Sequence, residues 1–434
     1  MKLSALYQIF LDCSVVTTDS RNCPEDSLFI ALKGESFNGN AFAMQALKDG
    51  CSYAVIDEPE YAIEGDNRFI VVSNCLETLQ QLANHHRQQL GTRVIGITGT
   101  NGKTTTKELI AAVLSKSHNV LCTQGNFNNH IGVPLTLLRL KPEHTLAVIE
   151  MGANHPGEIK QLVDIVEPDY GIITNVGRAH LEGFGSFEGV MKTKGELYDY
   201  LGTKEDATVF VHHDDSCLME MIQARKLLPI FYGSDESLYI SGQVISSSPY
   251  LAFEWKAGKE DKHHAVQTQL IGEYNLANLL AAVTIGSYFG VEALKINEAL
   301  TEYTPENNRS QLKKTADNTL IIDAYNANPT SMMAALENFD SMKMKHKMLI
   351  LGDMRELGVE SQVEHQKITD YIKKCSFAKV LLVGEHFSAI NHGYKAYSNT
   401  QELIKDLQVN KPRNSTILIK GSNGIKLNTI VDYL

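Results

Sequence analysis

The stretch GITGTNGKTTT, residues 96–106, combines glycines, a lysine and hydroxyl side chains in an order suited to phosphate binding. A Walker A loop reads G-x-x-x-x-G-K-[ST], but Ile97 stands where its first glycine would precede Gly102. Lys103 offers a mobile positive charge to β- and γ-phosphate oxygens, and Thr104 offers a hydroxyl to Mg²⁺. The stretch therefore predicts a nucleotide site of a subtype different from the Walker A loop.

The residues on either side of this loop predict the elements that position it. RVIGI, at 93–97, is an apolar and β-branched run typical of a strand, and KELIAAVLSK, at 107–116, has a helical pattern. A glycine-rich turn between a strand and a helix directs backbone N–H groups and a helix N-terminus at an anion. An accidental turn would rarely also supply a strand, a lysine, a hydroxyl and a helix in this order.

Apolar strands alternate with helical segments along most of the chain. The runs RVIGITG, NVLCTQG, TLAVIEMG, YGIITNVG and ATVFVHH predict a parallel sheet that is covered on both faces. Residues 237–271 alternate without helices and predict an antiparallel appendage, and a third α/β pattern follows NNRSQL at 307–312. Polar residues follow these strands, and ligands of open α/β sheets bind at the carboxyl ends of the strands.

The length of 434 residues exceeds the roughly 250 to 300 residues that one hydrophobic core holds. We therefore predict an α/β protein of three domains. A small α/β domain spans residues 1–90, and a central parallel-sheet domain with the phosphate loop spans residues 91–308. A Rossmann-like α/β domain spans residues 309–434.

Charge and cysteine usage exclude several classes of partner and compartment. The formal net charge of −11 argues against nucleic acid or an anionic membrane surface as a partner. The seven cysteines are scattered without a C-x-x-C pair, which suits a reducing compartment and neither a disulfide framework nor a zinc cluster. No apolar run approaches the length of a membrane span, and the N-terminus lacks a signal-peptide pattern. We expect a cytoplasmic protein without membrane insertion, and a monomer as the simplest assembly.

Several motifs resemble, in their order along the chain, those of the Mur ligase superfamily, whose members use ATP to form amide bonds in peptidoglycan precursor synthesis. TGTNGKTTT is similar to the loop of that family, and TTDSR with SLFIALKGESFNGNAF resembles its N-terminal UDP-binding module. DAYNANP with GDMRELG is the pair most specific for one member. The further motifs are GNFNNHIGVPLTLL (125–138), IEMGANHPGEI (149–159), NVGRAHLEGFGS (175–186), KTKGEL (192–197) and KGSN (420–423).

The resemblance implies a ligase that adds D-alanyl-D-alanine to UDP-N-acetylmuramoyl-tripeptide. A carboxylate is a poor acylating agent, so ATP would first convert the terminal carboxylate of the tripeptide into an acyl phosphate. The amine of the dipeptide would then attack, and ADP and phosphate would be released. Such phosphoryl transfer requires positioning and charge neutralisation more than covalent help from the protein.

The resemblance also implies two Mg²⁺ ions and a modified lysine. Thr104 and Glu150 would hold one ion and His180 would bind the second, whereas Lys194 would carry a carbamate that bridges to metal. A cationic lysine would be repelled by two metal ions, whereas a carbamate is anionic. KTKGE offers two lysines, and alignment on KGE favours Lys194, with Lys192 as a solvated surface residue. The predicted catalytic residues are Lys103, Glu150, His180 and Lys194.

Other residues are assigned to the nucleotide and to the substrates by the same resemblance. Asn278 would read the adenine edge, and Arg309 and Asp323 would reach the ATP when the domains close. Arg21 suits the uridine diphosphate because a guanidinium pairs bidentately with phosphate oxygens. The nucleotide set is Gly99, Thr100, Asn101, Gly102, Lys103, Thr104, Thr105, Asn278, Arg309 and Asp323, and the substrate set is Ser20, Arg21, Asn126, Asn128, Asn129, Asn326 and Asn328.

Two positions depart from the pattern of the family. His130 stands in GNFNNHIG where an acidic residue is common, and Asn423 follows KGS where an arginine is common. Both departures concern the substrate contacts more than the ATP chemistry.

Three other functions would also use such a phosphate loop. A sibling ligase for diaminopimelate or lysine, a folylpolyglutamate synthetase or a cyanophycin-type enzyme would share the loop, but DAYNANP, the UDP-type module and the lack of a D-N-P-R motif disfavour these. A nucleotide-gated regulatory or motor ATPase is disfavoured because a glutamate, Glu150, takes the place of a Walker B aspartate. A protein that binds without catalysis is disfavoured by the joint presence of Thr104, Glu150, His180 and Lys194. Either diaminopimelate or lysine as the third peptide residue is compatible with the sequence.

Overall fold

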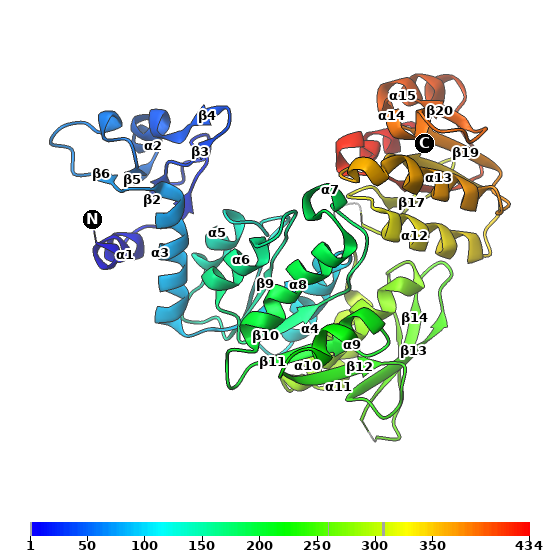
Figure 1. The fold of residues 1–434 in the computed structure, drawn as a ribbon, viewed down its shortest axis with the longest axis horizontal. Helices are drawn as coiled ribbons and strands as arrows, with labels where there is room; N and C mark the ends of the chain where they lie inside the picture. Colours follow the sequence, from blue (N-terminus) through cyan, green and yellow to red (C-terminus); the bar gives the residue numbers. More distant parts are fainter. Residues whose placement is uncertain (1, 259, 306–308) are drawn as a thin grey trace.

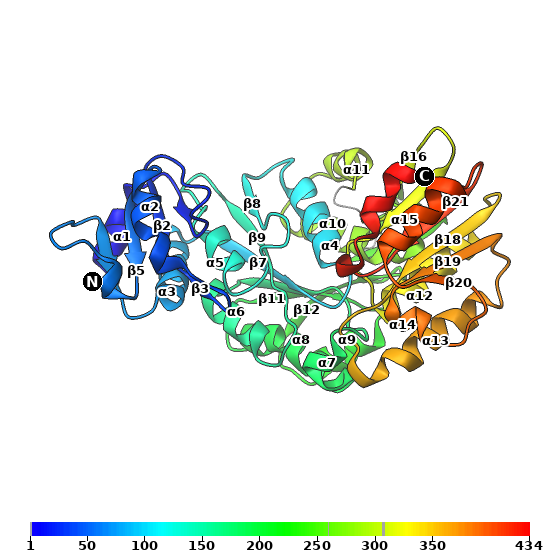
Figure 2. The same ribbon diagram turned by 90° about the horizontal axis from the view of Figure 1, so that it is seen from above.

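The computed structural model describes residues 2–258, 260–305 and 309–434. They form an N-terminal, a central and a C-terminal α/β unit, each built around a mainly parallel sheet. The N-terminal unit, in blue, and the C-terminal unit, in orange and red, lie at opposite ends of the central unit (Figure 1). The view from above shows the same sequence of units (Figure 2). The predicted three-domain α/β fold is therefore confirmed.

The N-terminal unit is a small parallel sheet of order β1-β2-β5-β6 with a separate β3–β4 hairpin. Its elements are α1 (Leu3–Leu11), β1 (Val16–Thr17), β2 (Ser27–Ile30), β3 (Lys33–Gly34), β4 (Phe37–Asn38), η1 (Gly39–Phe42), α2 (Ala43–Lys48), β5 (Cys51–Ile56), η2 (Pro59–Tyr61), β6 (Phe69–Val71) and α3 (Cys75–Leu90). All four residues of β2 are buried, as expected of an interior strand.

Helix α3 joins the N-terminal unit to the central unit (Figure 1). Its N-cap is Asn74, whose side chain accepts a hydrogen bond from the backbone N–H of Glu77, and its C-cap is Gly91 in the left-handed conformation. The helix also contacts the central unit along its length. Its side chains donate to the backbone oxygens of His130 (from Gln80, 3.0 Å) and Ile165 (from Asn84, 3.0 Å) and to Asp169 (from Arg87, 2.9 Å).

One apolar cluster continues from the N-terminal unit into the central unit. It contains Leu6 of α1, Leu28 of β2 and Leu79 of α3, together with Ile149 and Leu197 of the central unit. The N-terminal unit therefore shares a core with one face of the central sheet.

The central unit is built on a long sheet of order β15-β14-β13-β12-β11-β10-β7-β9-β8, and the phosphate loop follows the interior strand β7. Its elements are β7 (Arg93–Thr98), α4 (Lys103–Leu114), β8 (Val120–Cys122), α5 (Gly132–Leu137), β9 (Leu146–Glu150), α6 (Glu158–Val166), β10 (Tyr170–Ile173), α7 (Leu181–Phe184), α8 (Phe187–Leu201), β11 (Thr208–His212), α9 (Ser216–Gln223), β12 (Leu228–Gly233), β13 (Ile240–Ser246), β14 (Ala252–Ala257), β15 (His264–Gln267), η3 (Glu273–Asn275), α10 (Leu276–Tyr288) and α11 (Ala293–Glu302). Strands β13 to β15 are antiparallel, as predicted, and continue the same sheet. No described helix is long and apolar enough to cross a membrane.

The C-terminal unit is a sheet of order β16-β17-β21-β18-β19-β20, parallel except for the edge strand β16. Its elements are β16 (Gln311–Lys314), β17 (Thr319–Asp323), α12 (Pro329–Ser341), β18 (Lys347–Gly352), η4 (Gly358–Glu360), α13 (Ser361–Ile372), β19 (Lys379–Val383), α14 (Glu385–Ser388), β20 (Lys395–Tyr397), α15 (Thr400–Val409), β21 (Thr416–Lys420), η5 (Asn423–Ile425) and η6 (Leu427–Tyr433). Separate apolar clusters cover its two faces. The predicted boundary at 308/309 adjoins residues 306–308, which lie outside the described residues, so the domain boundaries stay a prediction.

Candidate active site

A cavity of about 720 Å³ lies between the central unit and the carboxyl edge of the C-terminal sheet. Of the predicted residues, all of which the structure describes, Gly99, Lys194, Ser20 and Arg21 lie outside its wall. The predicted residues in the wall are Thr100, Asn101, Gly102, Lys103, Thr104, Thr105, Asn126, Asn128, Asn129, Glu150, His180, Asn278, Arg309, Asp323, Asn326 and Asn328. The structure thus brings most of the predicted site together from segments far apart in the sequence.

The phosphate loop connects the end of β7 to the start of α4, as the sequence predicts. Gly99 has a φ of 141°, and a Cβ atom there would lie 2.1 Å from Oγ1 of Thr174. Gly102, with a φ of 75°, is the N-cap of α4. Both positions need glycine, because L side chains rarely adopt these conformations. The close fit keeps the loop backbone near the helix N-terminus, where N–H groups bind anions.

Lys103 is held inside the loop by the loop's own carbonyl groups. Its Nζ donates to the oxygens of Gly99 at 2.8 Å and Thr100 at 3.0 Å. Burial lowers the pKa of Lys103, while the negative charge of Glu150 opposes that shift. A phosphate group at the loop would replace weak carbonyl acceptors with a charged partner for this ammonium.

Glu150 is a buried carboxylate, and the hydrogen bonds that it receives from described side chains come from neutral groups. Its side chain accepts from Oγ1 of Thr104 at 2.9 Å and from Nδ2 of Asn128 at 2.8 Å, and Glu150 is 1% exposed. Among the described ion pairs, none includes Glu150. A buried carboxylate that forms no ion pair with a described side chain fits a bound metal ion, since buried charges are paired or coordinate metals.

The donor set around Glu150 also fits the coordination habits of Mg²⁺. Within the described residues, no group of three or more His, Cys, Asp or Glu side chains could hold a metal ion. Mg²⁺ is commonly bound through one or two carboxylates together with water and substrate phosphates. Glu150 and the hydroxyl of Thr104 meet that requirement when a triphosphate lies at the loop.

Lys194 is buried in α8, whereas Lys192 on the same helix is exposed. The Nζ of Lys194 lies 3.4 Å from the backbone oxygen of Ala153 and 5.3 Å from the centre of the Phe184 ring. Burial, aided by the positive charge of Lys103, holds the pKa of Lys194 well below its ordinary value. The two lysines of KTKGE therefore differ, and only for Lys194 does burial favour the neutral amine.

His180 lies where the central unit meets the C-terminal unit. It has a positive φ of 51°, and its Nδ1 contacts Oε2 of Glu356 in the C-terminal unit. The hydrogen bond from His180 lowers the pKa of Glu356. The imidazole thus lines the cavity while a carboxylate of the other unit holds its ring.

Asn278 lies against the phosphate loop at the start of α10. Its Oδ1 accepts a hydrogen bond from Thr106 at 3.0 Å, and its Nδ2 donates to Asn275 at 2.8 Å. Asn275 itself donates to the backbone oxygen of Ile271 at 2.8 Å and so fixes the turn before α10. A Cβ atom on Gly102 would lie 2.7 Å from Oδ1 of Asn278, so the amide and the loop are in close contact.

Arg309 and Asp323 lie in the cavity wall, and each contacts a residue that was not predicted from the sequence. The guanidinium of Arg309 lies 3.7 Å above the ring of Tyr325, and its Nε is buried without a hydrogen-bond partner among the described residues. Asp323 accepts from Lys420 at 2.6 Å, and Lys420 is 2% exposed. Lys420 could have been predicted as a site residue, because it is a charged residue at the end of the apolar run STILIK, as Glu150 is at the end of TLAVIE.

The asparagines of the substrate set have different roles in this structure. Asn129 accepts from the backbone N–H groups of Ile131 and Gly132 and thereby fixes a turn, whereas Asn128 contacts Glu150. Asn126 lines the cavity on the same loop.

Asn326 and Asn328 belong to the loop between β17 and α12. Asn326 accepts from the N–H of Ala327, and Asn328 caps α12 through Ser331. Nδ2 of Asn328 also donates to Oδ1 of Asn101 at 2.7 Å, which links the C-terminal unit directly to the phosphate loop. This contact between the units was not predicted.

Ser20 and Arg21 lie in the N-terminal unit. The guanidinium of Arg21 pairs with Asp19 at 2.8 Å, and the Arg21 side chain is 87% exposed. The backbone oxygen of Ser20 accepts from the thiol of Cys23.

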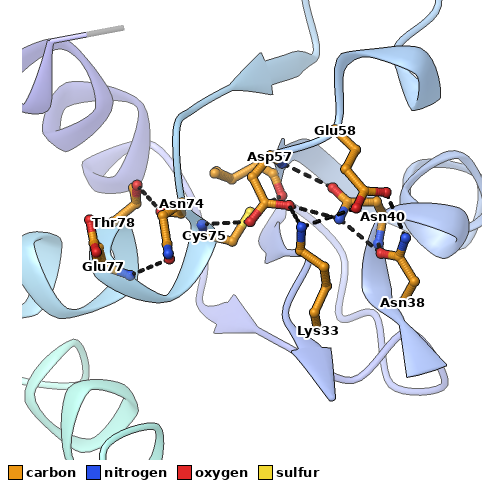
Figure 3. Close-up of polar contacts among 10 residues, drawn as sticks. Lys33, Asn38, Asn40, Asp57, Glu58, Asn74, Cys75, Glu77 and Thr78 are labelled. Atoms are coloured by element: carbon orange, nitrogen blue, oxygen red, sulfur yellow. Dashed lines mark hydrogen bonds and ion pairs between the residues drawn. The ribbon is translucent and has the colours of Figure 1, made fainter. Parts of the chain in front are cut away.

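The motif SLFIALKGESFNGNAF is organised around Asp57 and Glu58 (Figure 3). Lys33 pairs with both carboxylates at 3.0 Å, and Asn40 donates to Asp57 at 2.9 Å. Burial opposes ionisation of Asp57, but hydrogen bonds from the N–H of Cys75, from Asn40 and from Lys33 lower its pKa overall. The network fixes the β3–β4 hairpin against the end of β5 and the start of α3 (Figure 3).

Comparison with protein families agrees with this architecture. Residues 12–87 match "Mur ligase family, catalytic domain", residues 97–286 match "Mur ligase middle domain", and residues 308–423 match "Mur ligase, glutamate ligase domain". These matches together cover most of the chain.

Known proteins and solved structures resemble the chain over nearly its full length. The UDP-N-acetylmuramoyl-tripeptide–D-alanyl-D-alanine ligase of Bacillus subtilis is 35% identical over 96% of this chain and 92% of its own length, and that of Escherichia coli is 35% identical over 96% and 93%. The crystal structure of MurF from Acinetobacter baumannii has a TM-score of 0.88 at 30% identity, covering 99% of this chain and 98% of its own. MurF from Thermotoga maritima in complex with ADP has a TM-score of 0.85 at 25% identity, covering 98% and 97%.

A phosphate loop with a shifted glycine, a buried glutamate beside it and a C-terminal unit facing it thus occur in a chain whose three segments all match one family. By these matches and by its likeness to these ligases over almost its whole length, the chain belongs to the Mur ligase family.

Proposed function

We propose that this chain is the ATP-dependent ligase that joins D-alanyl-D-alanine to UDP-N-acetylmuramoyl-tripeptide in peptidoglycan precursor synthesis. ATP phosphorylates the terminal carboxylate of the tripeptide, and the amine of the dipeptide displaces phosphate from the acyl phosphate. ADP and phosphate leave with the extended peptide as product. The observation that carries this proposal is the cavity in which the phosphate loop and Glu150 face the carboxyl edge of the C-terminal sheet.

The residues of the loop hold the triphosphate in this proposal. The residues from Gly99 to Thr105 surround its oxygens, and the ammonium of Lys103 and the N–H groups at the start of α4 bind them. The N–H groups of Thr100 and Asn101 instead donate to Asn175 and hold the loop in place. Asn278 contacts the adenine. Arg309 lies over Tyr325, and its Nε, which has no hydrogen-bond partner among the described residues, donates to a phosphate oxygen. Asp323 and its partner Lys420 face the nucleotide from the C-terminal side.

We further propose two Mg²⁺ ions, one held by Thr104 and Glu150 and the other by His180. Bound Mg²⁺ neutralises phosphate oxygens and so favours phosphoryl transfer. Glu150 contributes a fixed negative charge, and Asn128 orients that carboxylate through its hydrogen bond. To bind this ion through Nδ1, His180 has to give up its contact with Glu356.

Lys194 carries a carbamate in our proposal. Its burial and its lowered pKa support a neutral amine, which can attack carbon dioxide with loss of a proton. The resulting anion would remove the repulsion between Lys194 and Lys103. The contacts of its Nζ with the backbone oxygen of Ala153 and with the Phe184 ring involve no acidic side chain.

The remaining assignments concern the substrates and the setting of the reaction. We propose that residues 1–90 bind the uridine diphosphate through Ser20 and Arg21, that residues 91–308 bind ATP, and that residues 309–434 bind the dipeptide and close over ATP. Asn126, Asn128, Asn129, Asn326 and Asn328 contact sugar or peptide groups. We propose a cytoplasmic monomer, in keeping with seven cysteines that are all free.

Phosphate release from ATP tests this function directly. The purified chain is assayed with UDP-N-acetylmuramoyl-tripeptide, with and without D-alanyl-D-alanine, and with single amino acids in place of the dipeptide. We expect release to require the dipeptide. Efficient turnover with a single amino acid would assign the chain to a sibling ligase, and hydrolysis without any acceptor would indicate a nucleotide switch.

A further inference from the structure

Lys107 is a buried lysine one helical turn beyond Thr104 on α4. It is 1% exposed, and because it follows Thr104 by three residues, both side chains lie on the same face of the helix. Burial of an ammonium group costs free energy unless hydrogen bonds or opposite charges compensate for it. The proposed chemistry does not use this ammonium group, so its role depends on the groups that it contacts.

The ammonium group of Lys107 holds the first residue after β8. Its Nζ donates to the backbone oxygen of Thr123 at 2.7 Å, and Thr123 is fully buried. The carboxylate of Glu108 is farther away, with its Oε1 3.7 Å from the same Nζ, and its Oε2 accepts from the hydroxyl of Tyr303 at 2.6 Å. The shorter contact of the buried ammonium group is therefore with a backbone carbonyl that belongs to the edge of the central sheet.

Thr123 in turn holds the backbone of Glu150. The N–H of Glu150 donates to Oγ1 of Thr123 at 2.9 Å, and the N–H of Thr123 donates to the backbone oxygen of Val148 on β9 at 3.1 Å. The side chain of Glu150 accepts from the hydroxyl of Thr104. These contacts close a ring of four residues, with Thr104 and Lys107 on α4, Thr123 after β8 and Glu150 at the end of β9. The ring fixes Glu150 to one face of α4 through both its backbone and its carboxylate.

We infer that Lys107 is a positioning residue for the Mg²⁺ ion at Glu150: by holding Thr123, it sets where that carboxylate lies relative to the hydroxyl of Thr104. The inference rests on the proposed function, in which Thr104 and Glu150 bind this ion. Lys107 and Thr123 lie outside the cavity wall, so they act on the site through Glu150. Groups behind a metal ligand orient that ligand, and their loss typically lowers metal affinity or activity by about 10- to 100-fold.

The effect of Mg²⁺ on nucleotide binding tests this role without any peptide substrate. Calorimetric titration of the full-length protein with a non-hydrolysable ATP analogue gives a Kd in Mg²⁺ and a Kd in EDTA. In the wild type, Mg²⁺ should tighten binding. Lys107→Met removes the charge from a side chain of similar length and should lose about 10-fold of this gain in affinity. Its Kd in EDTA should stay close to that of the wild type, because the phosphate loop is unchanged.

Variants of Thr123 test the route from Lys107 to Glu150. Thr123→Val removes the hydroxyl that accepts from Glu150 and keeps the carbonyl that accepts from Lys107, so it should also reduce the gain from Mg²⁺. Thr123→Ser keeps the hydroxyl and should behave as the wild type. Lys107→Met combined with Thr123→Val should be no worse than Lys107→Met alone, since both changes interrupt one path.

Lys204→Met is the matched control. Lys204 also donates to backbone oxygens, two of them at 3.1 Å, but these belong to residues 167 and 168, directly before β10. Because β10 is parallel to β7, this contact lies at the edge of the sheet opposite the phosphate loop. Lys204→Met should keep the full gain in affinity from Mg²⁺.

Equal gains from Mg²⁺ in Lys107→Met and Lys204→Met would overturn the inference and leave Lys107 a purely structural role. Fully additive effects in the double variant would also overturn it. If Lys107→Met does not fold, the comparison of Thr123→Val with Thr123→Ser decides, and equal gains in these two variants would contradict the inference. Failure of the proposed ligase activity is distinguishable, because phosphate release would then not require the dipeptide while the differences in Mg²⁺-dependent binding persist.

Discussion

The hydroxyl of Thr104 donates a hydrogen bond to Oε2 of Glu150 across 2.9 Å, and so joins the first turn of α4 to the end of β9. Because β7 and β9 are neighbouring parallel strands, the loop after β7 and the last residue of β9 meet at one sheet edge. The pair supplies a hydroxyl and a carboxylate where a metal–nucleotide complex would bind.

Replacing Glu150 by Gln should lower kcat by about 100-fold or more, since preorganised charge in an active site commonly contributes that much. The amide keeps the shape and loses the charge that would hold Mg²⁺. Phosphate release with both substrates present, measured over a range of Mg²⁺ concentrations, checks this. Asp164→Asn, an exposed residue paired with Lys160, is the control. Activity of Glu150→Gln within threefold of the control would contradict a role in metal binding.

Replacing Lys194 by Ala should abolish most of the activity, and short carboxylates added to the assay should restore part of it. The physical reason is that a small anion can fill the space of the missing carbamate. Lys192→Ala is a matched control, because Lys192 lies on the same helix but is exposed. Full activity of Lys194→Ala without any additive would rule out the carbamate.

Replacing Gly99 by Ala should destabilise the phosphate loop and prevent nucleotide binding. The new Cβ would lie 2.1 Å from Oγ1 of Thr174, and the φ of 141° suits only glycine. We expect a loss of about 1–3 kcal/mol in the free energy of unfolding, as for other strained backbone positions. Calorimetric titration with ADP and urea denaturation measure the two effects.

Gly65→Ala is the control for that experiment, because Gly65 also has a positive φ, 81°, but has nothing within 4 Å of an added Cβ. It should keep nucleotide affinity. Equal ADP affinity in Gly99→Ala and Gly65→Ala would show that the loop tolerates the methyl group.

Acidification should weaken the fold through His86, which is 4% exposed. Its Nε2 lies 2.9 Å from the oxygen of Leu140, which can only accept, so Nδ1 accepts from the hydroxyl of Tyr7 at 3.1 Å. Burial lowers the pKa of His86 below its ordinary value of 6.5. At a pH between the lowered pKa of folded His86 and about 6.5, the histidine binds a proton in the unfolded chain but not in the folded chain. The free energy of unfolding therefore falls as the pH drops below about 6.5.

Urea denaturation at pH 7.5 and at pH 5.5 measures this effect. His86→Gln should cost about 1–3 kcal/mol at neutral pH through the lost hydrogen bonds, and its stability should change less with pH than that of the wild type. His263→Gln, at an exposed position, should keep the pH dependence of the wild type. An unaltered pH dependence in His86→Gln would exclude His86 as the titrating group.

Local patterns in the sequence predicted much of the fold. RVIGI and KELIAAVLSK form β7 and α4, as predicted. These elements could be predicted because apolar periodicity and glycine placement are properties of short segments. The prediction of antiparallel strands in 237–271, which also used a local alternation pattern, is confirmed. Strand β20, with three residues, and the edge strand β16 carry too little pattern to be recognised.

The relations between distant segments could not be predicted in this way. Nothing in the local sequence places Glu356 against His180, since that contact depends on how the units pack. The burial that separates Lys194 from Lys192 depends on which face of α8 packs on the sheet. Motif order identified most of the cavity wall, whereas the pairing of Lys420 with Asp323 depends on the order of β17 and β21 in the C-terminal sheet.

The apolar cluster that runs from α1 through α3 into the central sheet has a consequence for cooperativity. Segments that share one core lose their stability together, whereas segments with separate cores can open independently. The first two units should therefore melt as a single block. The C-terminal unit, whose clusters contain Ile271 as the one described buried residue from the central unit, should melt as another. Substrates that bridge both blocks would merge the two transitions into one.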